Sequence, residues 1–314
     1  MSKIKSKISN TNPTIEQAVE MFMRRCKIKN LSDGTINAYG EKLEVFRKYL
    51  HDDFILTNLS SDTVDGFILW LRENTDNNDV SINSYLRHVR AFIYYLQENG
   101  YVNAFKIHLI KADKPIKETY TDAELEVLLK KPDFKKASFG EIRTWAFINF
   151  LCGSGQRLRT CINVKIKDVD FENFTITLRQ QKNRIQAIIP LSKTLADVLI
   201  RWLDIRGGNP DDFLFCTEYG EQLTDKGVQT AVYRYNHNHG VDKTSIHAFR
   251  HSFAKSWVMS GGDIFRLQKI LGHSTLEVTK GYVNLFGQDL QQNYEQFNPL
   301  DRLTKQRIIV KKGR

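Results

Sequence analysis

One short segment of the sequence, IHAFRHSFAKSW, carries three side chains that bind anions or protons. In a helix, His247 and Arg250 are three residues apart and His247 and His251 are four apart, so each pair shares a face. A guanidinium and an imidazole on one rigid face suit a phosphate group. An ordinary polar surface helix is the alternative. The two histidines also have the spacing of metal ligands, but no cysteine or carboxylate ligand is obvious nearby, so a zinc site is disfavoured.

A second segment, LGHSTLEVTKGY, has a histidine and a tyrosine on either side of a short predicted helix. Gly272 is expected to end one helix, and Ser274 with Glu277 forms the capping-box pattern that begins the next. His273 therefore lies at a junction whose backbone is fixed on both sides. The length of the helix then sets the separation between His273 and Tyr282. For a lone tyrosine, a place in the core or in an interface is the alternative.

Two further basic side chains follow features that often meet an anion. Arg157 comes just after a glycine turn, where a helix is expected to begin. Arg159 competes with it for that role, and an ion pair with a carboxylate is the alternative for Arg157. Lys182 lies in RQQKNR, the polar turn between two β-rich runs, Phe174–Arg179 and Ile185–Ile189, which predict a hairpin. A lysine at such a tip is usually solvated.

The elements that must position these side chains begin with a helical part. Residues 1–13 are basic and polar, which predicts a flexible arm and no secretory signal. Apolar residues at helical spacing then predict a bundle of four or so helices over residues 14–110. The charged stretch around Pro115 predicts a linker at residues 111–118.

A mixed part follows over residues 119–284. Thr121 with Glu124 forms a capping box at its start, and an apolar helix is predicted at Arg143–Leu151. The hairpin comes next, and helices resume at Lys193–Arg206 and continue to the end. The predicted fold class is therefore mainly α with a small antiparallel β-sheet, an α+β arrangement. Residues 285–314 form a C-terminal tail.

Composition favours a polyanionic partner. The 314 residues carry a net charge of +10. Residues 1–113 hold 15 Lys and Arg against 14 Asp and Glu, so almost all of the excess, +9, lies in the rest of the chain. Such a balance favours nucleic acid, with solubility alone as the alternative. The four cysteines are scattered and the sequence has no long apolar run, so we expect a reducing, cytoplasmic location and no membrane span.

Taken singly these signals are weak, but their order along the chain is specific. The segment from Arg157 to Tyr282 resembles the catalytic domain of the tyrosine recombinases, or phage integrases, of the Xer-like or mobile-element type. That family's HxLRH box corresponds to HAFRH, its LGH…Y box to LGHSTLEVTKGY, and its hairpin lysine to Lys182. Its first box, roughly GLRxSEL with an LxxxDID tail, corresponds to GQRLRTCINVKIKDVD, which matches at Gly155, Arg157, Asp168 and Asp170.

The resemblance implies DNA strand exchange through a 3′-phosphotyrosyl intermediate and a Holliday junction, with no metal, ATP or other cofactor. It implies six catalytic residues: Tyr282 as nucleophile, Arg157 and Arg250 on the phosphate oxygens, His247 for the tyrosine proton, Lys182 for the leaving 5′ oxygen, and His273 on the phosphate. Thr160 departs from the pattern, because the family often has an acid there that supports the active site.

The resemblance extends to assembly. The helical part is similar to the family's core-binding (SAM-like) domain, which with the catalytic domain would form a C-shaped clamp on double-stranded DNA. Family members act as four protomers on two DNA sites. The apolar residues of the tail suit docking on a neighbouring protomer, or packing within the same chain. Two other interpretations stay open: a non-catalytic DNA-binding protein on this fold, and DNA relaxation like that of a type IB topoisomerase.

Overall fold

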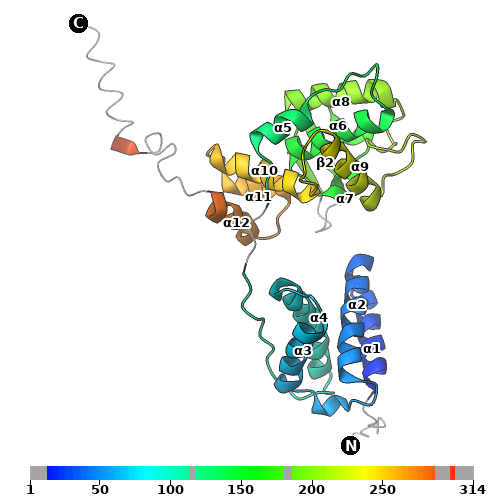
Figure 1. Cartoon of the computed structure of the whole chain (residues 1–314), viewed down its shortest axis with the longest axis vertical. Helices are drawn as coiled ribbons and strands as arrows, with labels where there is room; N and C mark the ends of the chain where they lie inside the picture. Colours follow the sequence, from blue (N-terminus) through cyan, green and yellow to red (C-terminus); the bar gives the residue numbers. More distant parts are fainter. Residues whose placement is uncertain (1–12, 114–117, 180–185, 287–297, 301–314) are drawn as a thin grey trace, which may run out of the picture. The chain divides into compact units, whose positions relative to one another are not determined.

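The computed structural model describes residues 13–113, 118–179, 186–286 and 298–300, with side chains of the last helix described as far as residue 283. The chain divides into two compact units, Met1–Pro115 and Ile116–Arg314, each with its own hydrophobic core (Figure 1). None of the helices in the described ranges is long and apolar enough to cross a bilayer.

The first unit is a helical bundle. Its helices are α1 (Ile15–Ile28), α2 (Asp33–Leu50), α3 (Ser61–Asn74) and α4 (Asp79–Glu98), with a 3₁₀ turn, η1 (Leu56–Asn58), between α2 and α3. Each α-helix begins at a Thr, Ser or Asn whose side chain accepts a hydrogen bond from a backbone N–H of the first turn. The predicted helical stripes are confirmed, because their apolar residues are the ones that fill the core of this unit.

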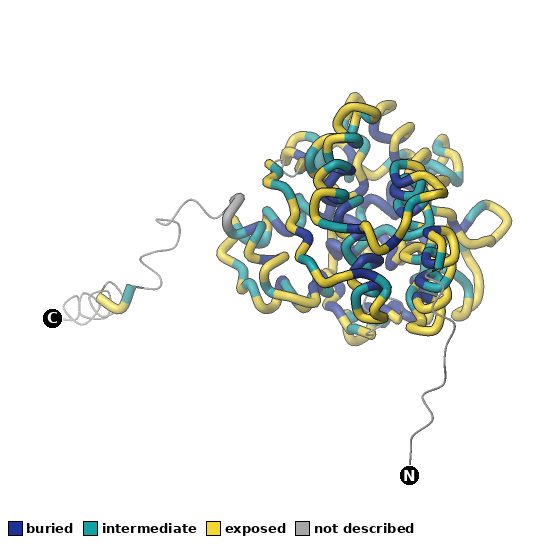
Figure 2. Tube along the Cα trace, turned by 90° about the horizontal axis from the view of Figure 1, so that it is seen from below, coloured by how far each residue is buried: buried dark blue, intermediate teal, exposed yellow. Residues whose placement is uncertain are grey.

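The second unit contains the remaining described elements. They are α5 (Asp122–Leu129), α6 (Phe139–Ser154), α7 (Leu158–Ile162), η2 (Ile166–Asp168), β1 (Val169–Asp170), β2 (Thr175–Leu178), β3 (Ala187–Pro190), α8 (Lys193–Arg206), α9 (Asp225–Asn238), α10 (Ile246–Met259), α11 (Ile264–Leu271) and α12 (Leu276–Phe286). Helix α6 is mostly apolar and buried over most of its length, and it packs against α8, α9 and α10, so it forms the centre of this unit. Figure 2 shows the buried segments enclosed by exposed loops and helix faces.

The sheet is small and antiparallel, in the order β1-β2-β3. The predicted hairpin is present in shorter form, with Ile176 opposite Ile189 and Leu178 opposite Ala187. Just before the hairpin, residues 166–168 form a 3₁₀ turn, and only Val169–Asp170 pairs with β2.

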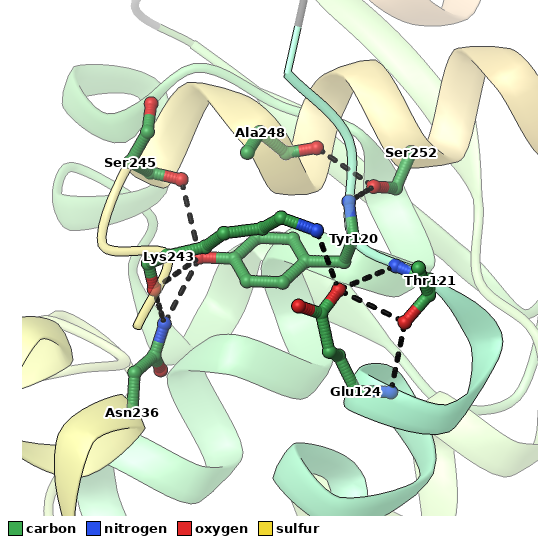
Figure 3. Close-up of polar contacts among 8 residues, drawn as sticks. All are labelled: Tyr120, Thr121, Glu124, Asn236, Lys243, Ser245, Ala248 and Ser252. Carbon is green, nitrogen blue, oxygen red and sulfur yellow. Dashed lines mark hydrogen bonds and ion pairs between the residues drawn. The ribbon is translucent and has the colours of Figure 1, made fainter. Parts of the chain in front are cut away.

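A polar network fixes the start of the second unit to α10 (Figure 3). The backbone N–H of Tyr120 donates to Ser252 Oγ at 2.7 Å, and the Tyr120 ring stacks on Phe249 with centroids 4.2 Å apart. Asn236 Nδ2 donates to the Tyr120 hydroxyl at 2.9 Å and to the carbonyl of Lys243 at 2.6 Å. The chain that follows the predicted linker is therefore bonded to the helix that carries the His-x-x-Arg motif.

Candidate active site

The site begins at a tight turn between two helices. Helix α6 ends at Gly155, which has a φ of 64°, in the left-handed region that glycine favours. A Cβ at this position would lie 2.5 Å from Phe253 Cδ1 and 2.9 Å from Leu271 Cδ2. Glycine is therefore required here both for the backbone angle and for the close approach of α10 and α11. The turn leads directly to Arg157, the N-cap residue of α7.

Arg250 is the buried centre of the site, with 4% of its surface exposed. Its Nη1 donates to the carbonyl of Gly155 at 2.9 Å, and its Nη2 donates to the carbonyl of Leu271 at 2.8 Å. The same Nη2 lies 2.8 Å from Nε2 of His273. Arg157 Nη1 reaches the carbonyl of Leu271 at 3.5 Å, so both guanidinium groups meet at the end of α11. These bonds fix the cations in advance of any ligand.

Tyr282 projects from α12 into the same place and is 2% exposed. Its hydroxyl lies 2.8 Å from Nδ1 of His251, on α10. Its ring is nearly parallel to that of His273, with an interplanar angle of 7° and centroids 6.2 Å apart. Nδ1 of His273 is in turn 2.8 Å from the hydroxyl oxygen of Thr279 on α12. The phenol oxygen is thus held between α10 and the junction that precedes α12.

The electrostatics of the site oppose spontaneous ionisation of the phenol. Burial raises the pKa of Tyr282, while the positive charges of Arg250 and Arg157 act to lower it, and burial outweighs them. Burial and the charge of Arg157 lower the pKa of Arg250 to about 10, so its guanidinium stays protonated at neutral pH. A buried, neutral phenol beside two cations needs a proton acceptor before it can act as a nucleophile.

His247 lies one helical turn before His251, and their ring centroids are 6.5 Å apart. Partial desolvation and the charges of Arg250 and Arg157 lower the pKa of His247, although its side chain is still exposed to solvent. It borders an open cleft of about 420 Å³ between α7, α9 and the start of α10. The other lining residues include Leu158, Gln229 and Tyr233. The cleft therefore opens beside the cations.

The structure brings together five of the six predicted site residues: Arg157, His247, Arg250, His273 and Tyr282. Lys182 lies outside the described residues. Arg159 instead bonds Asp225 at 2.7 Å on the surface, which excludes it as the alternative to Arg157. With Ser274 as the N-cap, the capping-box prediction placed the first helical residue at Thr275, whereas helix α12 begins at Leu276. The prediction was therefore wrong by one residue, and the junction that holds His273 is one residue longer than expected.

His251 is the residue that sequence reasoning missed. Its signal was the four-residue spacing from His247, which suggested metal ligands. Within the residues that the structure describes, no three His, Cys, Asp or Glu side chains gather as a metal site. The four cysteines, all in the described part, are free thiols. The arrangement as a whole can hold a tetrahedral anion between two guanidinium groups beside a phenol nucleophile.

Comparisons with known proteins agree with this arrangement. Residues 119–288 match the family described as the phage integrase family, and residues 16–119 match the phage integrase SAM-like domain. The chain is 28% identical over 304 residues to tyrosine recombinase XerC of Oceanobacillus iheyensis, covering 91% of this chain and 97% of that protein. It is 27% identical over 285 residues to tyrosine recombinase XerD of Listeria innocua, covering 86% and 94%.

Solved structures show the same fold. A lambda integrase dimer bound to a COC′ core site superposes with a TM-score of 0.71 at 15% identity, covering 88% of this chain and 98% of that one. The Tn1549 transposon integrase in complex with a circular intermediate DNA gives a TM-score of 0.70 at 20% identity, covering 84% and 94%.

Proposed function

Because this chain belongs to the phage integrase family, we propose that it is a site-specific DNA recombinase that cuts and rejoins strands through a covalent 3′-phosphotyrosyl link. The observation that carries the proposal is the position of the Tyr282 hydroxyl, buried beside Arg250 and Arg157 and 2.8 Å from a histidine nitrogen. That arrangement suits one reaction class, attack of a phenol on a phosphodiester. The matched relatives are named tyrosine recombinases, and the matched structures include integrases on DNA.

Each residue of the site has a distinct role in the proposed reaction. Arg157 and Arg250 hold the non-bridging oxygens of the scissile phosphate and neutralise the charge that builds up on them as Tyr282 attacks. His273, bonded to Arg250 and Thr279, keeps the phosphate and the phenol ring in register. A neighbouring histidine takes the phenol proton. Lys182 would protonate the leaving 5′ oxygen. Cleavage exchanges one phosphodiester bond for another, so the bond energy is kept in the phosphotyrosyl link. Rejoining therefore needs no nucleotide hydrolysis.

The second proposal concerns organisation. Residues 14–110 would act as the core-binding domain and residues 119–284 as the catalytic domain, joined by the linker at 111–118 and closing as a clamp on duplex DNA. Two DNA sites would be joined in a tetramer, with residues 285–314 docking on a neighbouring protomer. Of the five apolar residues that suggested this docking, Leu285 and Phe286 end α12, whereas Leu290, Tyr294 and Phe297 lie outside the described residues. A DNA substrate and four free cysteines support a cytoplasmic location.

The proposal is tested with DNA that flanks the protein's own gene. Footprinting would locate the bound site, and a nicked suicide substrate built on that site would trap the covalent intermediate. We expect a denaturation-resistant protein–DNA adduct with the wild type and none with Tyr282→Phe. Binding without an adduct would favour a non-catalytic protein. Relaxation of arbitrary plasmids by monomers would favour a topoisomerase.

A further inference from the structure

We propose that His251 is a catalytic residue, the acceptor of the Tyr282 proton when the phenol attacks phosphorus. The inference rests on the proposed function and deepens it. The resemblance assigns this proton to His247, but the hydrogen bond at 2.8 Å joins the Tyr282 hydroxyl to Nδ1 of His251. Such a distance is that of a direct proton transfer.

The fold holds this contact on rigid elements. His251 lies in the second turn of α10, immediately after Arg250, whose buried side chain is bonded to the end of α6 and to the end of α11. Tyr282 lies on α12, which packs against both α10 and α11. The rings of His251 and Tyr282 have centroids 5.6 Å apart and an interplanar angle of 51°. The two rings are inclined to each other, with the phenol oxygen at hydrogen-bonding distance from Nδ1.

The surroundings favour a neutral imidazole that accepts a proton. The charged or titratable groups around His251 and Tyr282 come from four places: Arg157 at the start of α7, His247, Arg250 and Lys255 on α10, His273 between α11 and α12, and Tyr282 itself. Most are cations. Cations disfavour a second positive charge on the imidazole before the reaction and favour the phenolate that forms during it.

His247 then has a different role, as a hydrogen-bond donor to the phosphate. Its side chain is exposed beside the cleft next to α7 and α9, whereas the phenol oxygen is buried. It lies close enough to Arg157 and Arg250 for their charges to lower its pKa. An imidazole in this position can donate its N–H to a phosphate oxygen that the two guanidinium groups hold. One histidine thus serves the phosphate and the other serves the nucleophile.

The step balances in protons and bonds. The proton moves from Tyr282 Oη to His251 Nδ1 as the phenol oxygen forms a bond to phosphorus. The bond from phosphorus to the 5′ oxygen breaks, and that oxygen takes a proton from the general acid. In the rejoining step a 5′ hydroxyl attacks the phosphotyrosine and returns its proton to the conjugate base of the general acid, while the imidazolium of His251 returns its proton to the leaving phenolate. The side chain therefore ends the cycle neutral.

The test is single-turnover cleavage of the footprinted suicide substrate by full-length protein. His251→Asn retains a polar atom near the phenol but cannot take a proton at neutral pH, and His251→Phe retains the ring shape. We expect both variants to bind DNA as the wild type does and to cleave about 100-fold or more slowly at pH 7, the size of a general-base contribution. Their rates should rise tenfold per pH unit above neutrality, because hydroxide must then remove the phenol proton.

A second substrate distinguishes loss of the group that deprotonates the nucleophile from loss of the group that protonates the leaving oxygen. A 5′-bridging phosphorothiolate leaves without protonation, so it should rescue loss of the general acid but not the His251 variants. His239→Asn is the matched control, since His239 Nδ1 also makes a hydrogen bond, at 2.7 Å to the carbonyl of Tyr235, away from the site. It should cleave at the wild-type rate.

The outcomes are distinct. If the wild type forms an adduct and His251→Asn does so within threefold of its rate, or if the sulfur substrate restores cleavage, the assignment of His251 is wrong and the proposed function stands. If the wild type forms no adduct on its bound site, both proposals are wrong. Should the variants unfold, ¹⁵N NMR of histidine-labelled wild type decides: a protonated Nε2 with a bare Nδ1 supports the acceptor role, and a protonated Nδ1 overturns it.

Discussion

At the scale of single residues, Arg250 and Arg157 act on the same phosphate but differ in what they do for the fold. Arg250 is buried and bonds two backbone carbonyls and His273, so it links the ends of α6 and α11. Arg157 is only half-buried, and its bond to Leu271 is long at 3.5 Å. Substitutions of the two arginines should therefore differ in how much unfolding free energy they cost, even though both arginines are expected to be required for cleavage.

We predict that Arg250→Lys loses about 2–4 kcal/mol of unfolding free energy, since an ammonium cannot reach all three acceptors and buried groups are left unpaired. Arg157→Lys should lose less than about 1 kcal/mol, because its surroundings are wetter. Both should lose adduct formation. Urea unfolding of each variant measures the first effect. Equal stability losses in the two variants would contradict the role given to Arg250.

The sequence was most informative at this scale, because the order of the basic boxes predicted that Arg157, His247, Arg250, His273 and Tyr282 form one site, and the structure brings these five residues together. It did not identify the contact of His251 with Tyr282. That contact depends on how α12 packs against α10, and no spacing within either helix encodes it. The spacing from Gly155 favoured Arg157 over Arg159, and the surface ion pair of Arg159 with Asp225 agrees with that choice.

At the scale of elements, the site depends on the close approach of three helix ends. Gly155 ends α6, Leu271 ends α11, and the carbonyls of both residues accept hydrogen bonds from Arg250. Helices and caps were largely predictable from apolar spacing and from Thr121–Glu124, whose capping box is confirmed. The start of α12 was predicted one residue too early, a difference within the range over which helix ends vary.

Alanine substitutions at two glycines distinguish the stability cost of the backbone conformation from the cost of overpacking. Gly155 and Gly207 both cap helices with positive φ, 64° and 62°, but nothing lies within 4 Å of a Cβ at Gly207. Gly207→Ala should cost about 1–3 kcal/mol through its backbone angles alone, because a positive φ with a ψ of −151° is essentially restricted to glycine. Gly155→Ala should cost about 1 kcal/mol for its left-handed backbone and roughly 1–3 kcal/mol more from overpacking against Phe253 and Leu271. Only Gly155→Ala should slow adduct formation. Thermal unfolding and the suicide assay check both, and equal behaviour would contradict the packing argument.

The network around Tyr120 makes a further prediction about α10. Tyr120→Phe retains the stack on Phe249 but loses the hydroxyl that Asn236 bonds, and should cost about 1 kcal/mol. It should also slow cleavage several-fold, because the hydroxyl also lies within 3.3–3.4 Å of the carbonyls of Lys243 and Ser245, just before α10.

The control for the Tyr120 network is Tyr235→Phe, whose hydroxyl bonds the carbonyl of Leu128 at 3.2 Å and is not bonded to the segment that leads into α10. It should lose similar stability and cleave normally. If Tyr120→Phe also cleaves at the wild-type rate, the network stabilises the unit without positioning the helix.

At the scale of the whole molecule, each of the two units has its own main hydrophobic core within the described residues, and each unit contains cysteine. Cys26 belongs to the first unit, whereas Cys152, Cys161 and Cys216 belong to the second. Desolvation raises the pKa of all four thiols, that of Cys152 to about 11. The thiolate is the reactive form, so native thiols should react slowly at pH 8.

Thiol labelling therefore reports each unit separately. In increasing urea, we expect Cys26 to become reactive at a different denaturant concentration from the three cysteines of the second unit, since the two cores share no buried cluster. Peptide mass spectrometry after a short alkylation pulse measures both transitions. Simultaneous labelling of all four would show that the units unfold as one.

The central claim is that the phenol oxygen of Tyr282 forms a covalent bond to DNA. Peptide mass spectrometry of the trapped adduct tests this claim most directly. After nuclease and protease digestion, the peptide that contains Tyr282 should carry a nucleotide through its phenol oxygen, and Tyr282→Phe should yield no modified peptide. A nucleotide attached to any other residue, or an undiminished adduct in the Phe variant, would contradict the account.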